Sequence, residues 1–146
     1  MLQKEIKIKT DKKFIDITEK AKKLTDASGV KSGLLNIYSL HTTLGIAIME
    51  NEILSKLDIC KYLEKLAPDD GSYDHDRIDL RQVPPDERVN GHSHIWKLSF
   101  PSSENVPITG GKLRLGEWQS ILLVELDWQE PFRERTVIFT CMGGEE

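Results

Sequence analysis

WQSILLVELDWQEPFRERTVIFTCM, residues 118–142, holds two long apolar runs on either side of a short polar segment. Apolar residues alternate along 118–127, with Trp118 and Leu122 on the same face, and this period of two predicts a β-strand. Residues 133–142 predict a second strand. We expect the two strands to pair as a hairpin through the turn at 128–131. We also expect Trp118 to belong to the core.

The rest of the chain predicts further strands. Residues 2–9 place Ile6 and Ile8 on one face and lysines on the other, as in a half-buried strand. Residues 34–40 are apolar enough to be buried on both faces. Shorter strands are expected at 44–49, 106–108 and 112–115.

Two amphipathic helices and one short helix are also predicted. Asp16 or Thr18 can cap the first helix, and Ser28–Gly29 ends it, because glycine readily adopts a left-handed conformation. Asn51 can cap the second helix, which must stop before Pro68. The apolar residues of the second helix recur at helical spacing, namely Ile53, Leu57, Cys60 and Leu63. A third, short helix is expected within 88–99.

These elements predict an α+β fold, in which an antiparallel sheet system carries two or three packed helices. A length of 146 residues suits a single domain, 1–146, that can bury a sizeable core. The hydrophobic share of 38% is ordinary for a folded chain and too high for a disordered one.

Charge and composition exclude several classes of protein. Lys+Arg 20 against Asp+Glu 24 gives a net charge of -4, whereas nucleic-acid binders normally carry a basic surplus. No segment is long enough to span a membrane, and the start of the chain lacks the apolar run of a signal peptide. Two cysteines, Cys60 and Cys141, do not make a disulfide framework. We therefore expect a cytoplasmic protein that binds neither nucleic acid nor membrane.

All four histidines lie at predicted junctions or in loops: His41, His75, His92 and His94. His75 belongs to the polar segment 69–91, and a loop this long in a compact domain is usually functional or disordered. Three imidazoles from separate loops can form an open metal site with room for water or substrate. The alternative is that surface histidines simply accumulate in loops.

Carboxylates and anion-binding groups accompany the histidines. Glu52 and Glu125 can orient an imidazole or act as a general base, whereas Asp127 is expected to be a solvated charge. Segment 90–119 is dense in histidine, serine, glycine and tryptophan, as functional loops often are. Hydroxyl, glycine-amide and guanidinium donors suited to oxyanions occur at Ser102–Ser103, at 109–112 and at Arg133 and Arg135. None of these matches a nucleoside-triphosphate loop.

Several motifs combine into a resemblance that covers the chain from about residue 4 to the final glycines. They are His41-Thr42-Thr43 with Asn51-Glu52, Tyr73-Asp74-His75, Asn90 with His94, Pro107 with Gly111, residues 115–119, and Glu125 before Arg133 and Arg135. Together they resemble the YjbQ family (UPF0047), whose members are also named secondary thiamine-phosphate synthase enzymes. The chain departs from the family pattern at Glu117 and in the longer acidic turn 127–131.

The resemblance implies a β-sandwich-like α+β fold, a homotrimer and a site at which three histidines converge. On this sequence those histidines are His41, His75 and His94, as catalytic groups and metal ligands, with His92 as a candidate fourth contributor. Glu52 and Glu125 would orient them. The resemblance also implies that substrate contacts come from Thr43, Ser103, Lys112 and Arg135.

The implied reaction is that of a transferase, a thiamine-phosphate synthase. It joins a hydroxymethylpyrimidine diphosphate to a thiazole phosphate and releases diphosphate. The family name also allows this synthase reaction to be a side activity of the protein. Two alternatives stay open: metal-assisted hydrolysis of a phosphoester or related bond, and a non-enzymatic trimeric protein that binds a small anion or metabolite. Three histidines without cysteine suit zinc, nickel or copper, of which zinc is the first expectation, and magnesium would accompany a diphosphate substrate.

Overall fold

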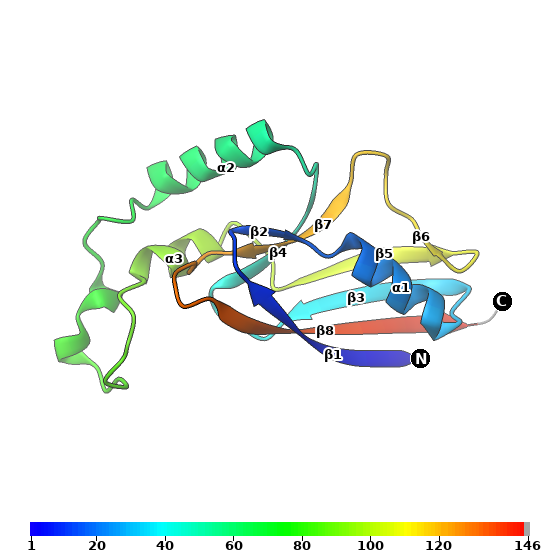
Figure 1. The fold of residues 1–146 in the computed structure, drawn as a ribbon, viewed down its shortest axis with the longest axis horizontal. Coiled ribbons are helices and arrows are strands. Elements are labelled where there is room, and N and C mark those ends of the chain that lie inside the picture. The colour runs from blue at the N-terminus through cyan, green and yellow to red at the C-terminus, as the bar shows by residue number, and fades with distance from the viewer. Residues whose placement is uncertain (145–146) are drawn as a thin grey trace.

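The computed structural model describes residues 1–144, in which the strands form two antiparallel sheets (Figure 1). The larger sheet has the order β1 (Leu2–Thr10), β8 (Arg133–Gly144), β3 (Ser32–Ser39), β5 (Ser103–Thr109) and β6 (Lys112–Leu113). The smaller sheet has the order β2 (Phe14–Asp16), β7 (Ser120–Glu125) and β4 (Leu44–Met49). The helices are α1 (Thr18–Ser28), α2 (Ile53–Leu66) and α3 (Gly91–Lys97), with short 3-10 turns η1 (Asp74–Asp76) and η2 (Ile78–Leu80). The predicted α+β class is confirmed.

The main core lies between the two sheets. Inward-facing residues of the large sheet, such as Leu35, Ile37 and Phe139, pack against Ile121 and Leu123 of β7. Helix α1 contributes Ala21 to the same core. Burial of these apolar side chains is the main favourable term in folding, at about 25 cal/mol per Å² removed from water.

A second apolar cluster covers the other face of the small sheet. Val124 and Leu126 pack there against Leu63 of α2 and Trp96 of α3. Strand β7 is therefore buried on both faces, because Ile121 and Leu123 point into the main core while Val124 points to the helices. The molecule thus has three layers: large sheet, small sheet, and α2 with α3.

The expected hairpin between the last two long strands is wrong. β7 pairs with β2 and β4, whereas β8 pairs with β1 and β3, so the two strands belong to different sheets. The chain crosses between the sheets in residues 126–132. The physical reason is that both faces of β7 are apolar, so each face needs a cover. A strand in the middle layer, between the large sheet and the helices, has a cover on both faces.

Two other burial expectations are also wrong. Trp118, expected in the core, is 70% exposed, because β7 begins two residues later. Strand β3, expected to be buried on both faces, alternates instead: Leu35 and Ile37 are buried, whereas Leu34 is 40% exposed. Within one chain the large sheet is covered on one face only, so every second residue of β3 faces outward.

Helix α1 ends where predicted, but its N-cap residue is Ile17, and not Asp16 or Thr18. Asp16 Oδ1 accepts a hydrogen bond from the Thr18 backbone N–H at 2.9 Å, which satisfies one of the free donors of the first turn. Gly29 ends the helix with φ 71°, the left-handed conformation expected of a helix-ending glycine.

Helix α2 departs from prediction at both its cap and its apolar face. Glu52, and not Asn51, caps it, by accepting hydrogen bonds from the Leu54 and Ser55 N–H groups at 2.8 and 2.7 Å. Leu63 is fully buried, but Ile53 and Leu57 are exposed. Only the end of α2 meets α3, and Figure 1 shows the helix along the outer side of the molecule.

Three connections between the sheets meet at one end of the sandwich: residues 11–13, 40–43 and 126–132. Their proximity is fixed by backbone hydrogen bonds from Glu125 N to Lys13 O (2.7 Å) and from Leu126 N to Thr43 O (3.0 Å). We refer to this region as the crossover end. Within the described residues, no helix is long and apolar enough to cross a membrane.

Candidate functional site at the crossover end

A buried ion pair anchors the crossover end. Arg135 of β8 donates two hydrogen bonds to Glu125 of β7, at 2.6 and 2.5 Å. Their side chains are 4% and 0% exposed. Arg135 also donates to Thr43 Oγ1 at 3.0 Å, and Thr10 donates to Glu125 at 2.7 Å. The pair therefore ties together the two sheets, the end of β1 and the connection 40–43.

The balance of forces on Glu125 favours its ionised form. Burial alone would raise the pKa of the Glu125 carboxyl, but hydrogen bonds from Arg135 and Thr10 and the arginine charge outweigh it and lower the pKa. A fully hydrogen-bonded carboxylate beside a guanidinium is poorly suited to take up a proton during catalysis. We infer that Glu125 positions the site.

Asp127 forms a second charged cluster, next to the first. The carboxylate is 7% exposed, receives hydrogen bonds from Asn90 (2.9 Å) and Arg133, and lies 3.9 Å from Arg88. The expectation that Asp127 is a solvated charge is therefore wrong. Its surroundings supply two guanidinium groups, which is the compensation that a buried carboxylate requires.

His41 lies in the connection 40–43 with one ring nitrogen occupied. Its Nε2 accepts a hydrogen bond from the Thr136 backbone N–H at 2.8 Å. Burial and the nearby charge of Arg135 lower the pKa of His41 below its ordinary 6.5, so the ring is neutral at pH 7. A neutral imidazole that accepts at Nε2 carries its proton on Nδ1. In this arrangement His41 can donate a hydrogen bond from Nδ1.

A cavity of about 240 Å³ lies beside His41 and is lined by Tyr38, Leu40 and Ser102 as well. Lys97 Nζ donates to Ser102 Oγ at 3.0 Å, and burial lowers the pKa of this lysine. Ser103, the serine named from the sequence, is instead turned to Asn36, whose amide donates to its hydroxyl at 2.7 Å. Of the two adjacent serines, Ser102 is the one that shares a cavity with His41.

His75 and His94 come together where η1 packs against α3. Their ring centroids lie 4.3 Å apart with the planes tilted by 47°. His75 Nδ1 is buried and has no hydrogen-bond partner within residues 1–144. Burial and the neighbouring His75 lower the pKa of His94, so the neutral form is favoured there.

The contact between these two histidines depends on a close backbone approach. α3 begins at Gly91, whose N–H donates to Asp76 Oδ1 at 2.8 Å. A Cβ at residue 91 would lie 2.6 Å from Tyr73 Cβ, which is closer than real Cβ atoms come. Glycine at this position therefore allows α3 to pack on η1 and brings His94 to His75.

The three histidines named from the sequence do not form one cluster within a single chain. Among the described residues, the only candidate metal ligands that gather in a group of three within 4.8 Å are Glu64, Asp69 and Asp70, which are exposed. His75 and His94 supply a pair of adjacent imidazoles, and His75 Nδ1 has no partner within residues 1–144. Their chemistry fits a zinc-type metal ion as two ligands, with the remaining positions open.

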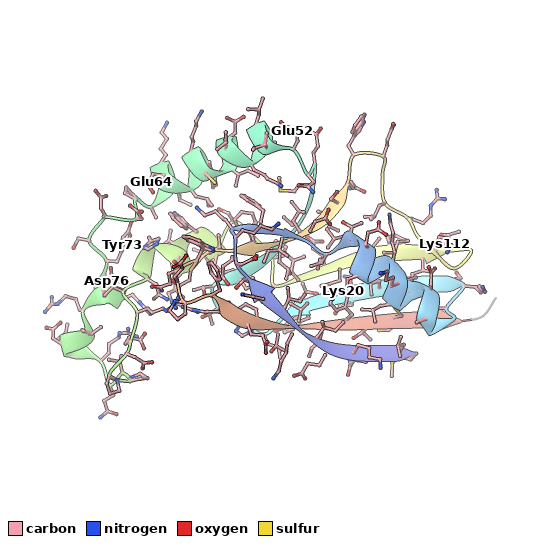
Figure 2. The ribbon with its side chains drawn as sticks, viewed as in Figure 1. Lys20, Glu52, Glu64, Tyr73, Asp76 and Lys112 are labelled. Atoms are coloured by element: carbon pink, nitrogen blue, oxygen red, sulfur yellow. The ribbon has the colours of Figure 1, made fainter. Side chains whose placement is uncertain are left out.

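Two other residues named from the sequence, Glu52 and Lys112, have partners elsewhere. Glu52 is engaged as the cap of α2, and Lys112 forms an exposed ion pair with Asp26 at 2.8 Å. Figure 2 shows Lys112 at the end of the molecule opposite Tyr73 and Asp76. Within one chain, neither side chain shares a site with His75 and His94.

Sequence reasoning named Asn90 and Ser102 only as parts of motifs and expected Asp127 to be solvated, so it did not place these residues in this region. The signal for Asp127 was its place directly after a strand that is apolar on both faces, because such a strand ends in a buried environment.

Residues 3–144 match the family described as UPF0047 protein YjbQ-like. A UPF0047 protein of Methanothermobacter thermautotrophicus is 37% identical over 125 residues, which cover 84% of this chain and 81% of the relative. The UPF0047 protein YugU of Bacillus subtilis is 31% identical over 145 residues, covering 96% and 98%.

Solved structures show the same fold. A YbjQ-like protein of unknown function from Sulfolobus solfataricus has a TM-score of 0.85 and 28% identity, covering 98% of this chain and 97% of the other. A YjbQ/UPF0047 family protein from Clostridium acetobutylicum has a TM-score of 0.77 and 34% identity, covering 97% and 100%. A family match over nearly the whole chain, joined to relatives of this similarity, places the protein in the YjbQ (UPF0047) family.

Proposed function

We propose that the protein is a metal-dependent transferase for small phosphorylated substrates, of the thiamine-phosphate-synthase type. In the reaction, a ring nitrogen of the thiazole phosphate forms a bond to the methylene carbon of the hydroxymethylpyrimidine diphosphate. The carbon–oxygen bond to the diphosphate breaks, and the electron pair leaves with the diphosphate. The resemblance to the family supplies the identity of this reaction, and the geometry supports its electrostatic needs.

The observation that carries the proposal is the contact between His75 and His94. Two half-buried imidazoles lie 4.3 Å apart, and one of them keeps a buried nitrogen without a partner within residues 1–144. Such a nitrogen costs free energy unless a ligand satisfies it. A divalent cation held by these two side chains would neutralise the charge on a departing diphosphate.

The chain's own residues would hold and orient the substrate around this point. His41 would donate from Nδ1 to a phosphate oxygen, since its Nε2 is already bonded to Thr136. Arg135 pairs with Glu125 and also donates to Thr43, so the role of the pair would be to keep the connection 40–43 in place. The hydrogen bond at Nε2 therefore changes the proposed role of His41 from metal ligand to hydrogen-bond donor.

A homotrimer remains part of the proposal. Lys112, expected as a substrate contact, lies at the end of the molecule opposite Tyr73 and Asp76 within one chain (Figure 2). A neighbouring copy could bring it to the same substrate. The oligomeric state in solution, measured by light scattering, tests this part separately.

The metal site is tested by elemental analysis of purified variants. His75→Ala and His94→Ala should each lose most of the bound metal, since each removes one of two protein ligands. His41→Ala should retain metal while losing turnover, and His92→Ala serves as the matched control that keeps metal. Equal metal content in all of these variants would refute the site.

Product analysis tests the reaction itself. With the metal-loaded protein, the proposed activity yields free diphosphate together with a coupled pyrimidine–thiazole product. Diphosphate and hydroxymethylpyrimidine without coupled product would instead indicate hydrolysis. Absence of turnover, combined with thermal stabilisation by the substrates, would indicate a binding protein.

A further inference from the structure

A second cleft lies on the side of α3 that carries His92. It has a volume of about 360 Å³, within the range of small-molecule sites, and its lining includes Lys13, His92, Trp96, Asp127, Trp128 and Gln129. Residues two apart on a helix point in different directions. His94 contacts His75, while His92 contacts Trp96, so the two histidines serve different sites.

Aromatic rings form the walls of this cleft. Trp96 is fixed, because its indole N–H donates to Leu63 O and Ala67 O at 2.7 and 2.8 Å. The His92 ring stands edge-on to Trp96, with centroids 4.6 Å apart. Trp128 is 46% exposed, and its ring centroid lies 6.0 Å from that of Phe132. A large aromatic side chain left half exposed in a cleft offers a surface on which a planar ring can stack.

Two donors in the cleft have no anionic partner. Lys13 is only partly exposed and its Nζ lies 5.2 Å from the centre of the Trp96 ring. Within residues 1–144, Lys13 joins none of the ion pairs. Within residues 1–144, neither ring nitrogen of His92 makes a hydrogen bond, and neither is among the buried side-chain atoms that lack a partner. Both groups are therefore available to an anion.

The carboxylate that lines the cleft is already compensated. Asp127 Oδ2 receives hydrogen bonds from Asn90 and Arg133, and Oδ1 receives one from Gln129 at 3.2 Å. Asp69 lies at the rim, exposed and close to Glu64 and Asp70. This acidic rim disfavours polyanions and favours a ligand with one compact anionic group.

We propose that this cleft binds a planar aromatic molecule that carries one compact anionic group, with the ring on Trp128 and the anion between Lys13 and His92. The inference goes beyond the proposed function, because it concerns binding without turnover and needs none of the metal ligands.

Calorimetric titration of the full chain, freed of metal by chelation, tests the proposal with three probes. Phenylphosphonate carries both the ring and the anion, methylphosphonate only the anion, and benzyl alcohol only the ring. Phenylphosphonate should bind about tenfold more tightly than either of the others, since one stacking contact and one charge contact each contribute about this factor.

Variants assign the binding to the cleft. Trp128→Ala and Lys13→Gln should each weaken phenylphosphonate binding about tenfold, and Trp128→Phe should restore most of the affinity. The matched controls are Trp118→Ala, an exposed tryptophan elsewhere, and Lys12→Gln, the exposed neighbour of Lys13. Both controls should bind as the unmodified protein does.

Two results would overturn the inference. One is phenylphosphonate binding no tighter than that of benzyl alcohol or methylphosphonate. The other is that Trp128→Ala and Lys13→Gln bind phenylphosphonate as tightly as their two controls do, while all four variants keep the melting temperature of the unmodified protein.

Discussion

The two ends of the sandwich carry similar residues in different settings. At the crossover end, Arg135 and Glu125 form an ion pair with both side chains almost fully buried. At the opposite end, Lys112 and Asp26 form an ion pair with side chains 74% and 53% exposed. Both ends were candidates for anion binding from the sequence. The difference shows that burial and hydrogen-bond geometry, and not residue type, decide where charge can serve a site.

Burial changes the energetic meaning of each pair. An exposed pair interacts through water and is screened by salt, so its contribution to stability is small. A buried pair has lost its hydration, and removal of one partner leaves the other charge uncompensated. The crossover end is therefore held in one arrangement, whereas the other end can change at little cost.

Glu125→Ala should have the largest effect. The substitution leaves the Arg135 guanidinium buried without its carboxylate, and we expect a loss of about 3–5 kcal/mol in the free energy of unfolding. Urea unfolding followed by circular dichroism measures it. The double variant Glu125→Leu with Arg135→Met should recover part of the loss, because it removes both charges. If Glu125→Ala loses no more unfolding free energy than removal of the exposed Lys112–Asp26 pair does, the two ends of the sandwich do not differ.

Acidification should have the second-largest effect on the stability of the crossover end. The pKa of Glu125 is lower in the folded protein than its ordinary 4.5. The stabilisation is therefore complete above about pH 4.5 and is lost as the pH falls through the lower folded pKa. Unfolding free energies measured from pH 7 to pH 3 should fall less steeply in Glu125→Gln than in the unmodified protein. Parallel curves would contradict a lowered pKa for this carboxyl.

Much of the fold could be predicted because it rests on local patterns. The alternation in β1, the apolar run of β4 and the glycine end of α1 each specify an element without knowledge of its neighbours. The hairpin between β7 and β8 could not be excluded in this way, because pairing depends on which sheet each strand enters. The apolar residues on both faces of 121–126 were the local clue to a strand with a cover on each side.

The residues of the candidate site could be named from the sequence, whereas their arrangement could not. His75 and His94 were named from their loops, but their contact depends on the close approach of Gly91 to Tyr73, a distance that no spacing reveals. The same holds for His41, whose proposed role as a donor rests on a hydrogen bond with the backbone of Thr136, 95 residues away. Such contacts arise from the packing of three connections at one end of the sandwich.

Asp127→Asn should have an intermediate effect. The substitution keeps the shape and the contact with Asn90 but removes the charge that compensates Arg133 and Arg88. These arginines are 27% and 24% exposed and can be hydrated in part, so we expect a loss of about 1–2 kcal/mol in the free energy of unfolding. Urea unfolding measures this loss. A loss equal to that of Glu125→Ala would mean that partial exposure offers no relief.

Lys112→Ala should have the smallest effect, within about 0.5 kcal/mol of the unmodified protein in urea unfolding. The pair with Asp26 gains little in water, and the residual difference should vanish at 1 M salt, where the screening length is about 3 Å. Lys31→Ala, a neighbouring lysine across the glycine turn, provides the matched control. A loss for Lys112→Ala that is large and persists in salt would mean that this end of the sandwich also holds a charge in place, since only a pair removed from solvent resists screening.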